Sequence, residues 1–229
     1  MKLILFDIDG TLIRSHGGGR QALGESLQEL FGTAGPIDSY HMSGKTDSRI
    51  VTDLLTAVGI PQSEIKAKLP EVFQRMAQKG LVIFWEKGME ACPGVETLLS
   101  QLKEHSSQIM LGLLTGNAAV TAPLKLSAAG IAPAQFAVGA YGSEAMERNE
   151  LPALAMQRAS ELAGYTFDGS KTVIIGDTPA DILCARAGKA TAVAVASGWH
   201  ASSTLINYQP DYLLDNLIDT EYILEILLD

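Results

Sequence analysis

The 229-residue sequence has few of the residues that build disulfide frameworks or zinc sites. Its two cysteines, Cys92 and Cys184, are far apart and form no Cys-x-x-Cys pair. The four histidines show no metal-ligand spacing: His16, His41, His105 and His200. No apolar run approaches the ~20 residues that cross a bilayer. Nor does the amino-terminal stretch resemble a secretory signal. This pattern predicts a cytoplasmic protein with reduced thiols and no membrane segment.

Positive charge is also scarce. The chain has 17 Lys and Arg against 26 Asp and Glu, which gives a formal net charge of −9. Such a balance argues against nonspecific nucleic-acid binding, which needs a basic face, and against binding to anionic membranes. A small phosphorylated ligand is still compatible with it if a metal ion and local donors reverse the charge within the site. The sequence leaves the oligomeric state open.

Apolar runs typical of buried strands alternate with helical patterns over most of the chain. Strands are predicted over 3–7, 109–114, 135–139, 172–176, 191–195 and 211–214. Helices are predicted over 94–104, 118–129, 151–163, 179–187 and 217–228. This alternation predicts an α/β fold: a Rossmann-like parallel sheet with helices on both faces, formed by residues 1–14 and 86–229.

The segment 15–85 interrupts this alternation. It contains helical patterns over 20–31, 47–58 and 62–80 but no convincing strand. We therefore expect it to be an inserted all-α cap domain. Gly17-Gly18-Gly19 precedes the first of these helices and is suited to a flexible hinge.

Two carboxylates, Asp7 and Asp9, directly follow the first apolar run. Ligands of open α/β sheets bind beyond the carboxyl ends of the strands. Residues i and i+2 of an extended chain point the same way, so one acid could attack a substrate while the other moves protons. An isolated Asp-x-Asp more often caps a helix or a turn, and it is the motifs downstream that favour the catalytic interpretation.

Two later apolar runs also end in polar residues. The first is followed by Thr115-Gly116-Asn117 and the second by Gly176-Asp177, with Asp181 four residues on. Arg148 lies between them in the sequence, and its charge and planar fork suit phosphate.

In the order and content of these motifs the sequence resembles the haloacid dehalogenase-like hydrolase superfamily. It is most similar to the phosphoglycolate-phosphatase-like branch, which carries a small helical cap. That resemblance implies a phosphoric monoester hydrolase that forms an aspartyl phosphate. Asp7 would be the nucleophile and Asp9 the general acid and base. The family's basic residue is usually Lys, and Arg148 is the best match here.

The same resemblance implies a Mg²⁺ site made by Asp7, the backbone carbonyl of Asp9, and Asp177. Thr115, Gly116, Asn117 and Arg148 would bind the phosphate. Some alternatives stay open. Asp181 could contact the metal or serve as a helix N-terminal acid, Asn117 could instead cap a helix starting at Ala118, and Arg148 could be a solvated surface residue.

Lys45 belongs to Ser43-Gly44-Lys45-Thr46, which resembles the end of a P-loop but lacks its first glycine. It could face the substrate or the solvent. Two rival functions remain. A phosphotransferase or sugar-phosphate mutase would pass the phosphoryl group to a second hydroxyl, and a phospho-accepting switch would keep it. Dehalogenase activity is disfavoured because that branch lacks an acid at the position of Asp9.

Overall fold

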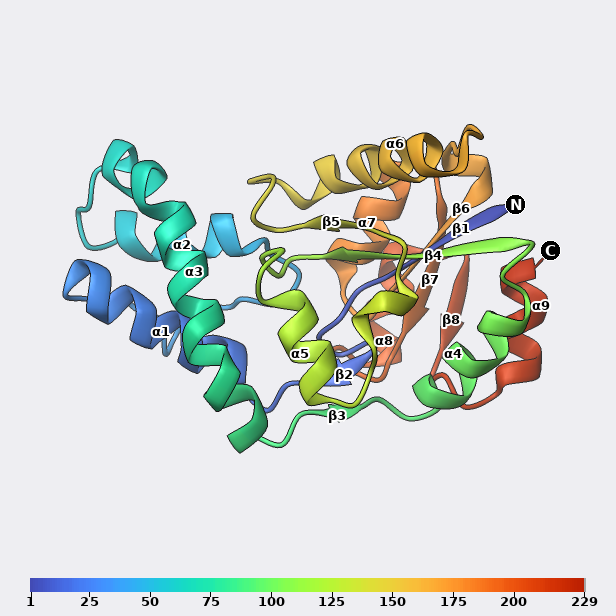
Figure 1. Ribbon diagram of the computed structural model, residues 1–229, viewed down its shortest axis with the longest axis horizontal. Helices are drawn as coiled ribbons and strands as arrows, with labels where there is room; N and C mark the ends of the chain where they lie inside the picture. The colour runs from blue at the N-terminus through green and yellow to red at the C-terminus, as the bar shows by residue number, and fades with distance from the viewer. Residues whose placement is uncertain (229) are drawn as a thin grey trace.

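The computed structural model describes residues 1–228 and shows a six-stranded parallel sheet (Figure 1). Its strands are β1 (Lys2–Phe6), β4 (Ile109–Thr115), β5 (Val138–Tyr141), β6 (Thr172–Gly176), β7 (Thr191–Val195) and β8 (Tyr212–Leu214). Their spatial order is β5-β4-β1-β6-β7-β8. This order places β1 between β4 and β6, so the three strands that carry the motifs are neighbours.

The sheet has a hydrophobic core on each face. Leu3 and Leu5 of β1 point to one core, and Ile4 and Phe6 point to the other. Because strand side chains alternate, a strand covered on both faces must be apolar throughout. This explains the uninterrupted apolar run at the start of the sequence.

Helices from the main part of the chain supply both cores. The Ile4 side is covered by α4 (Val95–Glu104), α5 (Ala122–Ala128) and α9 (Thr220–Leu228), and the Leu3 side by α6 (Leu151–Ala163), α7 (Pro179–Ala187) and the short α8 (Ser202–Leu205). Four 3₁₀ turns complete this part: Pro133–Gln135, Arg148–Glu150, Gly169–Lys171 and Ile206–Tyr208. The predicted α/β architecture with helices on both faces is confirmed.

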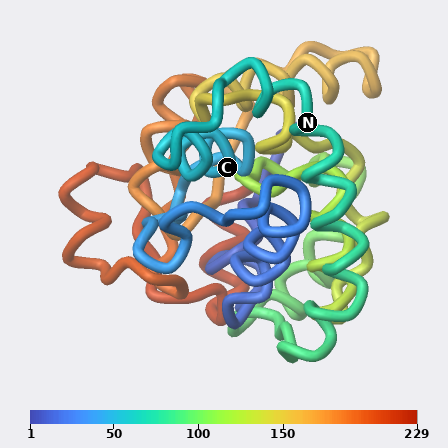
Figure 2. The backbone as a smooth tube through the Cα atoms, turned by 90° about the vertical axis from the view of Figure 1, so that its left-hand side faces the viewer, coloured from blue at the N-terminus to red at the C-terminus, as the bar shows by residue number. Residues whose placement is uncertain are grey.

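The insertion consists of α1 (Gly18–Phe31), α2 (Asp47–Thr56) and α3 (Gln62–Glu86). These helices enclose a third hydrophobic cluster, which includes Leu27, Leu54 and Val72. They stand at one end of the sheet, on the left in Figure 1, and lie in front in Figure 2. No strand lies between 15 and 85, as predicted.

Two short strands that the sequence analysis missed mark where the chain enters and leaves the insertion. β2 (Ile13–Arg14) pairs antiparallel with β3 (Glu90–Ala91). Two residues are too few for a periodic pattern to reveal. The predicted hinge also differs from the structure, because Gly18 and Gly19 already belong to α1. The two residues before α1, His16 and Gly17, have positive φ values of 45° and 77°.

Among residues 1–228, no helix has both the length and the apolar character needed to cross a membrane.

Candidate active site

Three neighbouring strands bring polar side chains together at one edge of the sheet. Asp7 directly follows β1, Thr115 ends β4 and Asp177 directly follows β6. The Asp7 amide still donates to the Ile175 carbonyl at 2.9 Å, which extends the pairing of β1 with β6. All three side chains are buried. The structure therefore brings together the strand-end residues that the sequence singles out.

Asp7, Asp177 and Asp181 form a buried carboxylate group. Each offers one oxygen, and these oxygens all lie within 4.8 Å of one another. Burial raises the pKa of Asp7 to about 6 and that of Asp177 well above its ordinary range, and the neighbouring acids add to both shifts. Such a group is self-repulsive without a cation.

The surroundings of Asp177 fit a hard metal ion. Its Oδ1 accepts a long hydrogen bond from Thr11 at 3.4 Å, whereas its buried Oδ2 has no hydrogen-bond partner among the described residues. Gly10 and Gly198 approach this carboxylate so closely that a Cβ on either would overlap it. A buried oxygen without a donor is costly, and a divalent cation with oxygen ligands would satisfy it.

Asp181 has a different set of partners. Its Oδ2 accepts hydrogen bonds from the amide (3.0 Å) and the hydroxyl (2.7 Å) of Thr178, in a capping box that starts α7. Its Oδ1 accepts from Arg148. Asp181 is thus an acid in the first turn of a helix, one of the two roles expected of it, and it also belongs to the carboxylate group that could hold a metal.

Arg148 is buried between two acids. Its Nη2 lies 3.1 Å from Asp7 Oδ1 and also pairs with Asp181. Burial disfavours the guanidinium charge, but Asp181 and Asp7 outweigh this and raise the pKa of Arg148. Its Nε has no partner among the described residues, and its Nη1 is directed toward Gly116. Arg148 is therefore not a solvated surface residue, and it keeps donors for an anion beside Asp7.

Asp9 is held by a second cation, Lys125. The Lys125 Nζ lies 2.9 Å from Oδ1 and 2.7 Å from Oδ2 of Asp9 and donates to Asn117 Oδ1 at 2.6 Å. Burial tends to raise the pKa of Asp9, but Lys125, together with hydrogen bonds from Ser15 and Asn117, lowers it. From the sequence, Lys125 is only a second choice, with Arg158, for the basic residue that binds phosphate, and nothing links it to Asp9. The one sequence feature that could point to Lys125 is that it is the only charged residue of α5.

Asn117 does not cap a helix at Ala118, because α5 begins only at Ala122. Its Nδ2 instead donates to Asp9 Oδ2 at 2.7 Å and to Thr115 Oγ1 at 2.8 Å. Asn117 thereby links the end of β4 to the residues that follow β1.

The start of α2 docks the insertion on this edge of the sheet. The Asp47 amide donates to the Gly116 carbonyl at 2.7 Å, and the Ala118 amide donates to the Asp47 carboxylate at 2.8 Å. The Thr46 hydroxyl donates to the Met146 carbonyl at 2.8 Å. The turn before α2 therefore lies directly over the loop that follows β4.

Lys45 belongs to the same turn, but its side chain lies within the insertion. Its Nζ donates to the Tyr40 hydroxyl at 2.7 Å and lies 3.8 Å from Asp53 Oδ2. The side chain is thus tied to its own insertion but keeps 39% of its surface exposed. That Lys45 faces the substrate stays a prediction.

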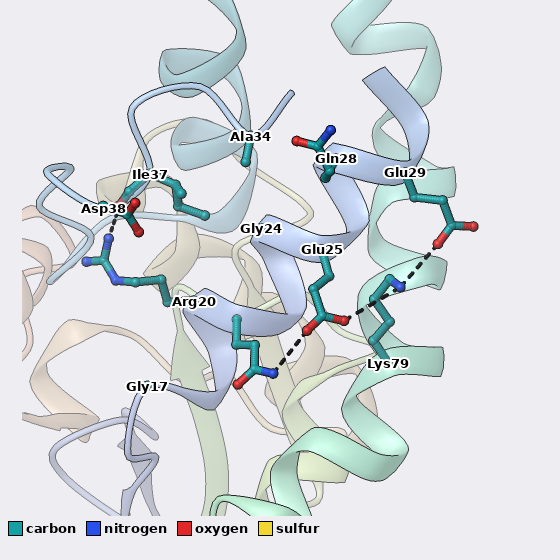
Figure 3. Close-up of a pocket in the computed structure, with 11 residues that line it drawn as sticks. Gly17, Arg20, Gly24, Glu25, Gln28, Glu29, Ala34, Ile37, Asp38 and Lys79 are labelled. Atoms are coloured by element: carbon teal, nitrogen blue, oxygen red, sulfur yellow. Dashed lines mark hydrogen bonds and ion pairs between the residues drawn. The ribbon is translucent and has the colours of Figure 1, made fainter. Parts of the chain in front are cut away.

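A hollow of about 690 Å³ lies elsewhere, on the insertion between α1 and the chain around Ile37 and Asp38 (Figure 3). Arg20 donates to the Ile37 and Tyr40 carbonyls, and Lys79 pairs with Glu25 and Glu29. Its cations are thus already engaged, and the hollow does not include the carboxylate group.

Comparison with known proteins agrees with this geometry. Residues 1–189 match the family of haloacid dehalogenase-like hydrolases. A protein named phosphoglycolate phosphatase, from Nitrosococcus oceani, is 26% identical over 228 residues, covering 97% of this chain and 96% of its own.

Solved structures share the fold. CbbY from Rhodobacter sphaeroides, crystallised in complex with phosphate, superposes with a TM-score of 0.69 at 18% identity over 96% of each chain. A hydrolase from Pseudomonas syringae gives a TM-score of 0.71 at 20% identity over the whole of both chains. The α/β sheet with its helical insertion is the fold that these structures share with the chain. The chain belongs to the haloacid dehalogenase-like hydrolases.

Proposed function

We propose that this hydrolase is a Mg²⁺-dependent phosphatase that cleaves a small phosphorylated metabolite through an aspartyl phosphate on Asp7. The observation that carries the proposal is the pairing of Asp7 with both a guanidinium and an unsatisfied carboxylate. Arg148 supplies donors beside Asp7, and Asp177 presents a buried oxygen without a partner. Arg148 can bind the negative charge of a phosphoryl group, and Mg²⁺ can satisfy the free oxygen of Asp177.

Asp7, Asp177 and the backbone carbonyl of Asp9 would hold the ion. When bound, Mg²⁺ offsets the repulsion between a carboxylate nucleophile and a phosphate dianion. In this proposal Thr115, the Gly116 amide and Asn117 hold phosphate oxygens together with Arg148. Arg148 would neutralise charge on the transferring phosphoryl group.

The reaction has two steps. Asp7 attacks phosphorus and the bond to the leaving oxygen breaks, while Asp9, which has to enter this step in its protonated form, gives that oxygen its proton. Asp9 then takes a proton from water, whose oxygen attacks phosphorus and displaces Asp7. The products are an alcohol and inorganic phosphate, and both carboxyls return to their starting state.

We further propose that residues 15–85 act as a cap domain over a core of residues 1–14 and 86–229. Several relatives at 23–26% identity are named phosphoglycolate phosphatase, which makes 2-phosphoglycolate the first substrate to test. A sugar-phosphate phosphotransferase or mutase is the alternative. It would use the same first step but pass the phosphoryl group to a second hydroxyl.

The test is phosphate release by the purified protein from 2-phosphoglycolate, sugar phosphates and p-nitrophenyl phosphate, with Mg²⁺ or with chelator. We expect turnover that needs Mg²⁺ and that Asp7→Asn abolishes. Full activity in chelator would contradict the metal assignment. Transfer to a second sugar without phosphate release would identify the alternative. No turnover of any ester would refute the proposed function.

A further inference from the structure

The chain buries two cations, and the proposed reaction accounts for only one of them. Among residues 1–228, Lys125 and Arg148 are the Lys and Arg side chains classed as buried. Arg148 pairs with Asp7, the phosphoryl acceptor of the proposed reaction. Lys125 pairs with Asp9, the proposed acid and base. Asp7 and Asp9 thus each pair with a different buried cation.

Lys125 and Asn117 together fix both oxygens of Asp9. Oδ1 accepts from Lys125, and Oδ2 accepts from Lys125 and from Asn117. Lys125 also holds the Asn117 carbonyl at 2.6 Å, which orients the amide toward Asp9. The three side chains form a closed ring of hydrogen bonds. A carboxyl held from two sides has lost the rotational freedom that an exposed Asp keeps.

The first helix of the insertion lies against this ring. A Cβ placed on Gly19 would come within 2.9 Å of Lys125 Nζ, so a glycine at this position lets α1 approach the ammonium closely. Asp47, at the start of α2, also attracts the Lys125 charge. Lys125 is thus enclosed between Asp9 on the sheet side and two helices of the insertion.

We propose that Lys125 is a positioning residue that orients Asp9 toward the leaving oxygen, and that α1 holds Lys125 in place through Gly19. This inference rests on the proposed phosphatase reaction. Simple neutralisation of a buried acid would also explain an ion pair. If Lys125 only neutralised Asp9, its loss should slow all esters alike. If Lys125 positions Asp9, its loss should slow most the esters whose leaving group needs a proton.

Leaving-group dependence separates these two roles. For esters whose leaving alcohols differ in acidity, kcat/KM reports the first step, in which Asp9 donates its proton. Alkyl phosphates need that proton, whereas p-nitrophenyl phosphate hardly does. In Lys125→Met we expect kcat/KM to fall about 100-fold for alkyl phosphates and by no more than about threefold for p-nitrophenyl phosphate, within the range of general acid catalysis. An exposed lysine, in Lys103→Met, is the control and should leave both values unchanged.

Gly19→Ala tests the same idea with Lys125 intact and guards against a misfolded Lys125→Met. Alanine favours a helix at position 19 but presses on the ammonium. We expect the same selective loss for alkyl esters, smaller than in Lys125→Met. Gly24→Ala in the same helix contacts only the end of the Ile37 side chain and is the matched control.

An equal loss for all esters in Lys125→Met and Gly19→Ala would overturn the proposal. A crystal structure of Lys125→Met gives a readout that does not depend on activity. If the Asp9 carboxyl has turned away from Asn117 in that structure, Lys125 positions it. If the carboxyl has not moved, the proposal is contradicted. If the wild-type protein cleaves no ester, the proposed function fails, and the crystal structure still decides whether Lys125 orients Asp9.

Discussion

At the residue scale, the acids of the site, Arg148 and Asn117 could be found from the sequence, whereas the pairing of Lys125 with Asp9 could not. Asp7, Asp9 and Asp177 each follow a buried strand, and strand ends can be recognised locally. Lys125 is remote in sequence from Asp9, and only the packing of α5 beside β1 brings them together. Asp181 was undecided because a helix acid and a metal ligand look alike in sequence.

Replacing Asp9 should separate the two proton transfers. Asn cannot protonate a departing alkoxide, so Asp9→Asn should cleave alkyl phosphates very slowly. Nitrophenol leaves without that proton, but the second step then lacks the base that activates water. Rapid-quench kinetics should show up to about one equivalent of nitrophenol per enzyme, followed by a stall. Mass spectrometry should detect a phosphorylated protein. Equal slowing of both esters without phosphoprotein would show that Asp9 acts through loop geometry.

Mg²⁺ should stabilise the protein, and more so at higher pH. Asp7 has a folded pKa of about 6, above its ordinary 3.8, and the pKa of Asp177 is also raised. Without metal, the contribution of these two carboxyls to stability is therefore fully present below about pH 4 and is lost as the pH rises through 6. At ten times its dissociation constant, Mg²⁺ should add about 1.4 kcal/mol, or roughly 3–6 °C in Tm.

Thermal melts with and without Mg²⁺ at pH 5 and pH 8 would measure this shift. Asp177→Asn should melt higher than the wild type without metal and should show little shift with it. A wild-type shift that Asp177→Asn leaves intact would place the metal elsewhere.

At the element scale, periodicity located the long elements better than their ends. The helix predicted over 62–80 continues to Glu86, because its last turns pack Ile83 and Phe84 into the main core. The helix predicted from 118 begins at Ala122, because residues 116–118 bind Asp47 of the insertion instead. Tertiary contacts of this kind leave no local pattern in the sequence.

The N-terminus of α2 should make stability depend on pH. Burial raises the pKa of Asp47 to about 6 from an ordinary 3.8. Its contribution is therefore fully present below about pH 4 and is lost as the pH rises through 6. Asn keeps an acceptor for the Ala118 amide without the charge. Asp47→Asn should thus match the wild type near pH 4 and exceed it by about 3 kcal/mol at pH 7.5.

Urea unfolding in Mg²⁺ across this pH range would measure the difference. Asp38→Asn, at an exposed position of the insertion, should show none. A constant difference at all pH values would mean that folding does not shift the pKa of Asp47.

At the scale of the whole molecule, the alternation of elements predicted the sheet and the helical insertion. It could not predict how closely the two parts meet. The sharpest contact is at Gly116, where a Cβ would overlap the backbone carbonyl of Lys45. A carbonyl within a hydrogen-bonded turn cannot move aside as a flexible side chain can.

Gly116→Ala should therefore lift the insertion off the sheet without unfolding it, because α1–α3 keep a hydrophobic cluster of their own. The radius of gyration from X-ray scattering should increase, and a single cooperative unfolding transition should confirm that the protein folds. If the insertion selects substrates by closing over the site, preference among natural esters should fall much more than cleavage of p-nitrophenyl phosphate. Gly24→Ala should keep the wild-type radius and preference. A compact Gly116→Ala with unchanged preference would show that the turn at Lys45 yields, and that specificity must be sought in the loops of the sheet.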